Sequence, residues 1–169
     1  MQNKILDATC GGRTIWTPDN KDRDDVLYID KREKENGFAG QENRSYGINP
    51  DEVKDFRDLP YSDNSFKLVV FDPPHVIKED GEPNGYVQKN YGVLDKENWK
   101  ETLKQGFSEL WRVLESDGFL VFKFADNDAY WTEVMDLFPV DPLFGTTTKQ
   151  RSNIQTRWFV FFKTGDYGE

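Results

Sequence analysis

The sequence has a single cysteine, Cys10, and a single histidine, His75. One cysteine excludes an internal disulfide framework and fits a reducing compartment. With so few sulfur and imidazole ligands, we expect no zinc site and assign no metal ligands. No apolar run is long enough to cross a bilayer, and the first residues lead into a short strand pattern rather than a signal peptide. We therefore expect a cytoplasmic protein that does not enter membranes.

Positive charge is also scarce, because 22 Lys and Arg stand against 31 Asp and Glu, for a net charge of −9. Gripping a polynucleotide through its phosphates needs Lys and Arg, so bulk electrostatics do not favour such binding here. One basic cluster lies beside aromatic residues, at Lys149, Arg151 and Arg157. It is a candidate phosphate-contacting surface. The alternative is a solvated hairpin.

Aromatic residues, at 15% of the chain, and short apolar runs are plentiful. A chain of 169 residues fits one domain, 1–169. Short apolar runs bounded by turns and helices indicate an α/β fold with a mostly parallel sheet buried on both faces. The predicted strands are 4–7, 26–30, about 53–56, 68–71, 118–124 and about 157–163.

Apolar residues recur every three or four positions from Trp99 to Leu114, which predicts a helix. We expect Gly118 to end it in a left-handed conformation. A second helix is predicted at about 128–138. The segments 31–51 and 78–94 lack periodicity, and we expect long loops there that act as lids or are disordered. No segment resembles a separate target-recognition domain.

Candidate ligand-binding residues follow the first four predicted strands. Ligands bind at the carboxyl ends of the strands in such a sheet. Asp30 can accept hydrogen bonds from both hydroxyls of a ribose, and Asp55 with Phe56 suits the amino group and ring of adenine. The candidate cofactor-binding residues are Asp7, Ala8, Thr9, Cys10, Gly11, Asp30, Asp55, Phe56 and Asp72.

The tetrapeptide Asp72-Pro73-Pro74-His75 ends the fourth predicted strand and is the candidate catalytic segment. A carboxylate beside a proline carbonyl presents two acceptors, which matches the two N–H donors of an exocyclic amino group. The alternative is an ordinary acidic turn. His75 is predicted either to contact the substrate or to be a turn residue. Tyr86, Lys89 and Tyr91 are candidate substrate-binding residues or an ordinary loop.

The order of these motifs resembles the class I S-adenosylmethionine-dependent methyltransferases with an Asp-Pro-Pro-aromatic segment, over nearly the whole chain. The segments 71–75, 91–94, 142–145 and 158–163 more closely resemble small stand-alone methyltransferases of phages and prophages of Gram-positive bacteria. The resemblance implies a Rossmann-like fold with an antiparallel last strand. It also implies S-adenosylmethionine as cofactor and S-adenosylhomocysteine as product.

Two departures from that family are visible. The loop Asp7-Ala8-Thr9-Cys10-Gly11-Gly12 lacks the usual Gly-x-Gly spacing, and the short stretch 13–25 implies a truncated first helix. His75 also stands where the family has Tyr, Phe or Trp.

The resemblance implies methylation of an exocyclic amino nitrogen, most simply N6 of adenine in DNA. Cytosine N4 and an RNA base amine are alternatives, and a protein amide is a weaker one. The expected partner is therefore a nucleic acid, with DNA favoured over RNA. A nonenzymatic nucleoside-binding module is the competing hypothesis from another class.

Overall fold

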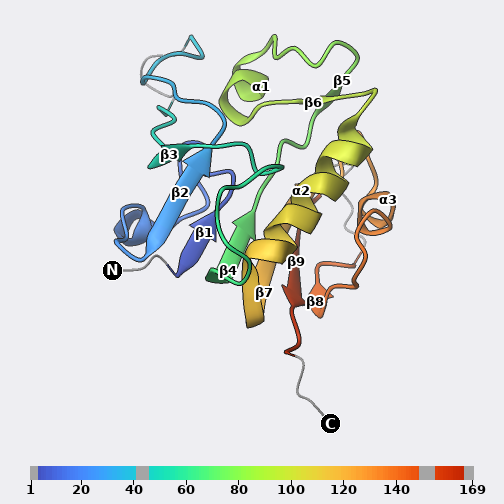
Figure 1. The fold of residues 1–169 in the computed structure, drawn as a ribbon. Helices are drawn as coiled ribbons and strands as arrows, with labels where there is room; N and C mark the ends of the chain where they lie inside the picture. The colour runs from blue at the N-terminus through green and yellow to red at the C-terminus, as the bar shows by residue number, and fades with distance from the viewer. Residues whose placement is uncertain (1–3, 41–45, 149–154, 166–169) are drawn as a thin grey trace.

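The computed structural model describes residues 4–40, 46–148 and 155–165. Within them, seven strands form one sheet in the order β3-β2-β1-β4-β7-β9-β8 (Figure 1). All neighbours are parallel except at β9, which runs antiparallel to β7 and to β8. The strands are β1 (Ile5–Asp7), β2 (Val26–Asp30), β3 (Glu52–Val53), β4 (Phe66–Phe71), β7 (Leu114–Ala125), β8 (Phe144–Gly145) and β9 (Thr156–Phe162). The predicted α/β Rossmann-like architecture with an antiparallel last strand is confirmed.

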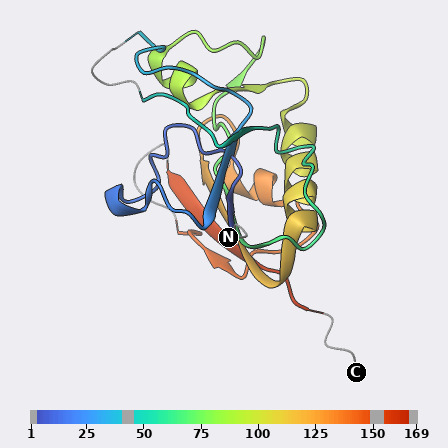
Figure 2. The ribbon, with the colours of Figure 1, turned by 60° about the vertical axis from the view of Figure 1, so that its left-hand side comes forward.

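Helix α2 (Trp99–Val113) covers one face of the sheet, as its apolar periodicity predicts. It buries Leu103, Phe107 and Leu110 in the main core. Helix α3 (Trp131–Met135) lies on the same side but is shorter than the predicted helix at 128–138 (Figure 2). Tyr130 has an extended backbone, and the Asp126 side chain accepts the Trp131 N–H, so the helix begins only there.

The expected left-handed end of α2 at Gly118 is wrong. The chain passes directly from α2 into β7 at Leu114, whose backbone is already extended, and Asp117 is the residue with a left-handed φ of 63°. Gly118 is required for another reason. A Cβ there would lie 2.9 Å from the carbonyl oxygen of Lys67 on β4, too close for any side chain.

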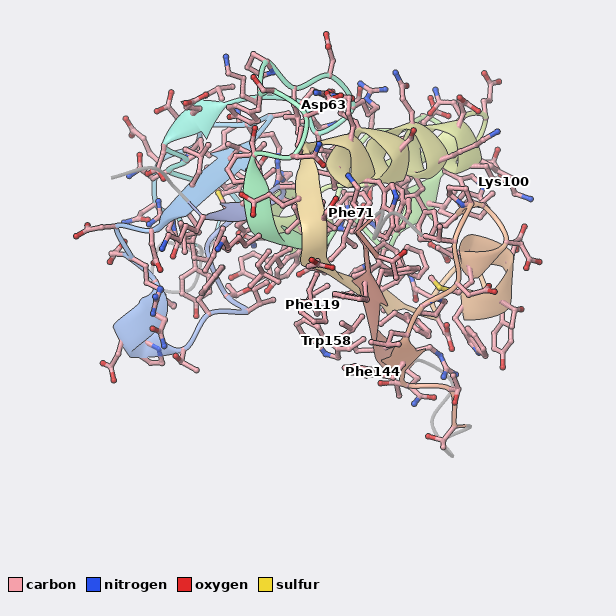
Figure 3. All side chains as sticks on the ribbon, turned by 60° about the horizontal axis from the view of Figure 1, so that its bottom comes forward. Asp63, Phe71, Lys100, Phe119, Phe144 and Trp158 are labelled. Atoms are coloured by element: carbon pink, nitrogen blue, oxygen red, sulfur yellow. The ribbon has the colours of Figure 1, made fainter. Side chains whose placement is uncertain are left out.

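The truncated first helix is confirmed. Between β1 and β2 the chain forms only a short 3-10 turn, η1 (Pro18–Asn20). Trp16 replaces part of the missing packing, because its ring meets Tyr28 edge-on with centroids 5.4 Å apart. This face of the sheet is the one opposite α2, and it exposes Phe119, Trp158 and Phe144 (Figure 3).

The segment 78–94 is not a continuous loop, contrary to prediction. It contains helix α1 (Tyr86–Tyr91), which begins after Gly85 and ends at Gly92 with a φ of 82°. Two short strands, β5 (Ile77–Lys78) and β6 (Leu94–Asp95), pair in parallel beside it (Figure 1). This unit lies over the carboxyl ends of the main strands (Figure 1). In the segment 31–51, Lys34 and Ile48 form an isolated bridge.

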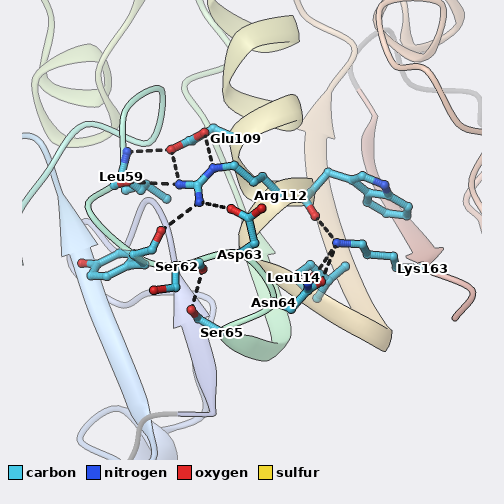
Figure 4. A network of polar contacts seen from close by, with 11 residues as sticks. Leu59, Ser62, Asp63, Asn64, Ser65, Glu109, Arg112, Leu114 and Lys163 are labelled. Carbon is cyan, nitrogen blue, oxygen red and sulfur yellow. Dashed lines mark hydrogen bonds and ion pairs between the residues drawn. The ribbon is translucent and has the colours of Figure 1, made fainter. Parts of the chain in front are cut away.

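A polar network at the opposite end of the sheet joins the chain before β4 to helix α2 (Figure 4). Arg112 donates to the carboxylates of Glu109 and Asp63, both at 2.7 Å, and to the carbonyl oxygens of Leu59 and Tyr61. Leu59 N–H in turn donates to Glu109. In the described part of the chain, no helix is long and apolar enough to cross a membrane.

Candidate active site

Three carboxylates gather at the carboxyl edge of the sheet, because β2, β1 and β4 are parallel neighbours that end there. These are Asp30, Asp7 and Asp72. The loop after β1 forms hydrogen bonds with the ends of both strands that neighbour β1. Thr9 Oγ1 accepts the Asp72 N–H at 2.9 Å, and Gly11 N–H donates to Asp30 Oδ2 at 3.1 Å. The three predicted motifs therefore form one connected rim.

Two cavities open along this rim. The first, called here the Asp30 cavity, has a volume of about 290 Å³. The second, called the Lys123 cavity, has a volume of about 570 Å³. Residues lining the Asp30 cavity include Ala8, Asp30, Asp55, Phe56, Arg57, Pro74 and Leu94. Residues lining the Lys123 cavity include Cys10, Gly11, Gly12, Pro73, His75, Val87, Asn90, Lys123, Thr156 and Trp158. Thr9, Arg32, Asp72 and Tyr91 line both.

The Asp30 cavity combines carboxylates with an aromatic wall. Asp30 is almost fully buried, and Arg32 donates to it from its backbone and its guanidinium at 2.9 and 3.0 Å. Arg57 hydrogen-bonds Asp55 and holds the pKa of that carboxyl below its usual range. Phe56 packs on the core with its ring 5.0 Å from that of Phe71. Such a set of acceptors and an apolar wall suits a nucleoside.

Asp7 is completely buried and lines neither cavity. Its two oxygens accept hydrogen bonds from Thr9 N–H at 3.2 Å and from Trp16 Nε1 at 2.7 Å. Burial outweighs these bonds and raises the pKa of Asp7 to about 7. Asp7 therefore shapes the loop that borders the cavities and stands one layer behind their surface.

Asp72 lines the Lys123 cavity and contacts two other residues that line it. Lys123 Nζ donates to Asp72 Oδ2 at 2.8 Å, and His75 Nε2 lies 3.1 Å from Asp72 Oδ1. The His75 ring packs edge-on against Phe124 with centroids 5.1 Å apart, and in the described part of the chain its buried Nδ1 has no hydrogen-bond partner. His75 is thus tied to Asp72 within the turn while still lining the cavity.

Helix α1 is joined to the rim through Arg32. The guanidinium that holds Asp30 also donates, at 3.2 Å, to the carbonyl oxygens of Lys89 and Asn90 near the end of α1. Of the three candidates in this segment, Tyr91 lines both cavities. Tyr86 and Lys89 line neither.

The prediction that Arg157 offers a phosphate-contacting surface is wrong. Its side chain is 2% exposed, forms an ion pair with Asp126 and lies against the ring of Trp131. Residues 157, 159 and 161 alternate onto the sheet face that the core covers, so Arg157 points inward while Trp158 points outward. Lys149 and Arg151 lie outside the described residues.

Sequence reasoning missed Arg32, Lys123 and Trp158. Lys123 had a signal, since it is the one charged residue in the apolar run 118–124 of a central strand. A buried charge there requires a partner. Arg32 pairs locally with Asp30, but its contact with α1 and the contact of Trp158 with Lys123 join segments distant in the sequence, so no local pattern indicated either role.

Comparison with known proteins supports the fold. No protein-family model and no curated protein matches the chain. The crystal structure of the PH0226 protein from Pyrococcus horikoshii OT3 is similar, with a TM-score of 0.58 and 18% identity, over 97% of this chain and 83% of that one. A geranyl diphosphate methyltransferase crystallised with GPP and sinefungin has a TM-score of 0.52 and 10% identity, over 96% of this chain and 72% of that one. These similarities show that the chain shares its Rossmann-like α/β fold with a known methyltransferase.

Proposed function

We propose that this protein transfers a methyl group from S-adenosylmethionine to an exocyclic amino nitrogen of a nucleobase, with adenine N6 in DNA as the leading acceptor. The observation that carries the proposal is the position of Asp72-Pro73-Pro74. Asp72 lines both cavities, Pro73 lines one and Pro74 the other. The segment thus stands where a donor in one cavity would meet an acceptor in the other.

The Asp30 cavity is the proposed site of the nucleoside part of the cofactor. Asp30 would accept hydrogen bonds from the ribose hydroxyls, and Asp55 and Phe56 would contact the adenine. The family resemblance of these segments supports the assignment, as does the bound sinefungin, an S-adenosylmethionine analogue, in the geranyl diphosphate methyltransferase. When bound, S-adenosylmethionine supplies an activated methyl group on a sulfonium.

Asp72 and the Pro73 carbonyl act on the acceptor. Both accept hydrogen bonds from the amino group, which localises the nitrogen lone pair toward the incoming methyl. The rigid turn aligns that nitrogen, so most of the rate gain comes from positioning. The nitrogen would gain the methyl group as the S–C bond of the donor breaks and leaves a neutral thioether, and the methylated amino group would then release one proton to solvent.

The charges of the Lys123 cavity favour a neutral acceptor. Asp72 and Lys123 form an ion pair there, so a protonated amine would gain little attraction from Asp72 and would be repelled by Lys123. Trp158 and Tyr91 add aromatic surface suited to a flat ring. A base inside a duplex cannot enter such a cavity, so it must be flipped out or single-stranded.

Methyl transfer from labelled S-adenosylmethionine tests the proposal. We expect label in unmethylated single-stranded and duplex DNA, recovered as N6-methyldeoxyadenosine after digestion. RNA and a protein mixture are the parallel acceptors, and Asp72→Asn is the matched inactive variant. Label in deoxycytidine, RNA or protein would identify one of the other acceptors instead. Cofactor binding without transfer to any acceptor would favour the nonenzymatic module, and absence of cofactor binding would refute the proposal.

A further inference from the structure

Lys123 is an unusual residue for the middle of a core strand. It lies on β7 between Phe122 and Phe124, both buried, and its own side chain is only 20% exposed. Its register partner on β9 is Trp158, whose ring centroid lies 5.7 Å from Nζ. Strand β7 pairs on its other side with β4, which ends at the Asp72 turn. Burying a cation here costs free energy unless it pairs with an opposite charge.

That partner is Asp72. The two side chains are 2.8 Å apart at Nζ and Oδ2, and the Asp72 side chain is 15% exposed. At this separation and burial the pair is screened far less than a surface ion pair. His75 contacts the other carboxylate oxygen, and Thr9 Oγ1 accepts the Asp72 N–H. Asp72 is therefore held from three sides, and Lys123 supplies the fixed charge among them.

The charges along the rim show what Lys123 balances. Of the three carboxylates, Asp30 is paired with Arg32 and Asp72 with Lys123. Among the described residues no cation contacts Asp7, which burial keeps largely protonated below pH 7. Asp30 and Asp72 are thus each paired with a cation before any ligand enters. A cationic ligand entering beside Asp72 would meet a carboxylate that is already neutralised.

We propose that Lys123 is a positioning residue that holds the Asp72 carboxylate toward the acceptor and, as a competing cation, weakens the attraction of the site for the sulfonium of S-adenosylmethionine. The inference rests on the proposed function, because it takes Asp72 to lie beside the reacting methyl group. S-adenosylhomocysteine is uncharged at sulfur. Lys123 thereby reduces the preference of the site for the cationic donor over the neutral product.

Calorimetry with both cofactor forms tests the electrostatic part without any acceptor. Lys123→Met should raise the ratio of the S-adenosylhomocysteine Kd to the S-adenosylmethionine Kd by about three- to tenfold, since Asp72 then faces the sulfonium unneutralised. Lys123→Arg should keep the wild-type ratio. Lys67→Met, which removes an exposed lysine from the neighbouring strand β4, is the matched control and should change nothing. An unchanged ratio in Lys123→Met would overturn the inference.

A double variant tests the pairing directly. In an Asp72→Asn background, Lys123→Met should raise the ratio less than in wild type, because only the direct repulsion between Lys123 and the sulfonium is then relieved. An equal effect in both backgrounds would mean that Lys123 acts by its own charge without Asp72 and would overturn the pairing. If Lys123→Met does not fold, as judged by circular dichroism, Lys123→Gln takes its place in both measurements.

Turnover on the DNA acceptor tests the proposal that Lys123 positions the Asp72 carboxylate. Lys123→Met should lower kcat at least tenfold without raising KM for S-adenosylmethionine, and Lys123→Arg should recover most of the loss. Equal kcat in Lys123→Met and wild type would overturn this part.

The outcomes separate the two proposals. A wild type that binds both cofactor forms but methylates no DNA refutes the DNA acceptor alone, whereas an active wild type with an unchanged affinity ratio in Lys123→Met refutes the role of Lys123 alone.

Discussion

Asp7 makes the stability of the protein depend on pH in an unusual direction. Its pKa is about 7 in the folded protein and 3.8 in a model peptide, so the folded chain keeps a proton that the unfolded chain releases. The contribution of Asp7 to stability is thus complete below about pH 4. It is lost as the pH rises toward 7, by up to about 1.4 kcal/mol per pH unit.

The Asp7→Asn variant isolates this effect, because Asn does not titrate. Urea unfolding of both proteins between pH 4 and 8 should show the stability of wild type falling relative to the variant as pH rises. The difference should level off above about pH 7, where Asp7 is ionised in both states. A difference that stays constant over the range would mean that Asp7 is ionised in the folded protein throughout.

At the same scale of single residues, substitution of Asp30 tests cofactor binding. Asp30→Ala should weaken S-adenosylmethionine and S-adenosylhomocysteine equally, by about 1–3 kcal/mol, because both lose the acceptor of their ribose hydroxyls. Calorimetry measures both affinities. Equal losses distinguish this position from Lys123, where only the ratio of the two affinities should move. Unchanged binding of both ligands would place the ribose elsewhere.

At the scale of elements, Arg32 is the tie between helix α1 and the sheet. A helix of six residues is not stable alone, so α1 depends on tertiary contacts. Arg32→Ala removes the donors to the carbonyl oxygens of Lys89 and Asn90. Hydrogen exchange across residues 86–91 should then become faster, while exchange in α2 stays as in wild type.

Arg57→Ala is the matched control for that experiment. Arg57 clasps Asp55 much as Arg32 clasps Asp30, but it donates to no atom of α1 among its described hydrogen bonds. Exchange in α1 should be unchanged in this variant. Equal acceleration in both variants would show that α1 responds to general loosening of the rim, and would contradict a specific tie through Arg32.

At the scale of the whole molecule, Arg112 joins parts of the chain that are distant in sequence. It bonds the segment 59–63 to the end of α2, the helix that covers the core (Figure 4). Arg112→Ala leaves two backbone carbonyls and the Glu109 carboxylate without this donor. The free energy of unfolding should fall by about 1–3 kcal/mol.

Chemical denaturation measures that loss, and Arg23→Ala is its control. Arg23 also forms an ion pair, with Asp25, but it lies on the surface and should contribute nothing measurable. A loss in Arg112→Ala no larger than in Arg23→Ala would show that solvent replaces the network.

Local sequence determined the elements whose signals are short-range. The apolar period of α2 and the apolar runs of β2 and β4 predicted those elements, because burial of one helix face or of a whole strand leaves a periodic record. Asp30 and Asp72 were identified because each follows such a strand, and parallel strands bring their ends to one edge. The stretch between β1 and β2 was visibly too short for a full helix.

Only the tertiary structure decided which side chains meet at that edge. Arg157 and Lys123 are both cations in apolar strands. Arg157 is buried beneath α3 and pairs with Asp126, whereas Lys123 pairs with Asp72 at the turn after β4. Helix α1 was missed because its six residues carry almost no period and depend on Arg32, more than fifty positions away. Strand order, register and the paths of distant segments create these contacts. No local pattern records them, because their energies depend on partners that the chain brings together only when it folds.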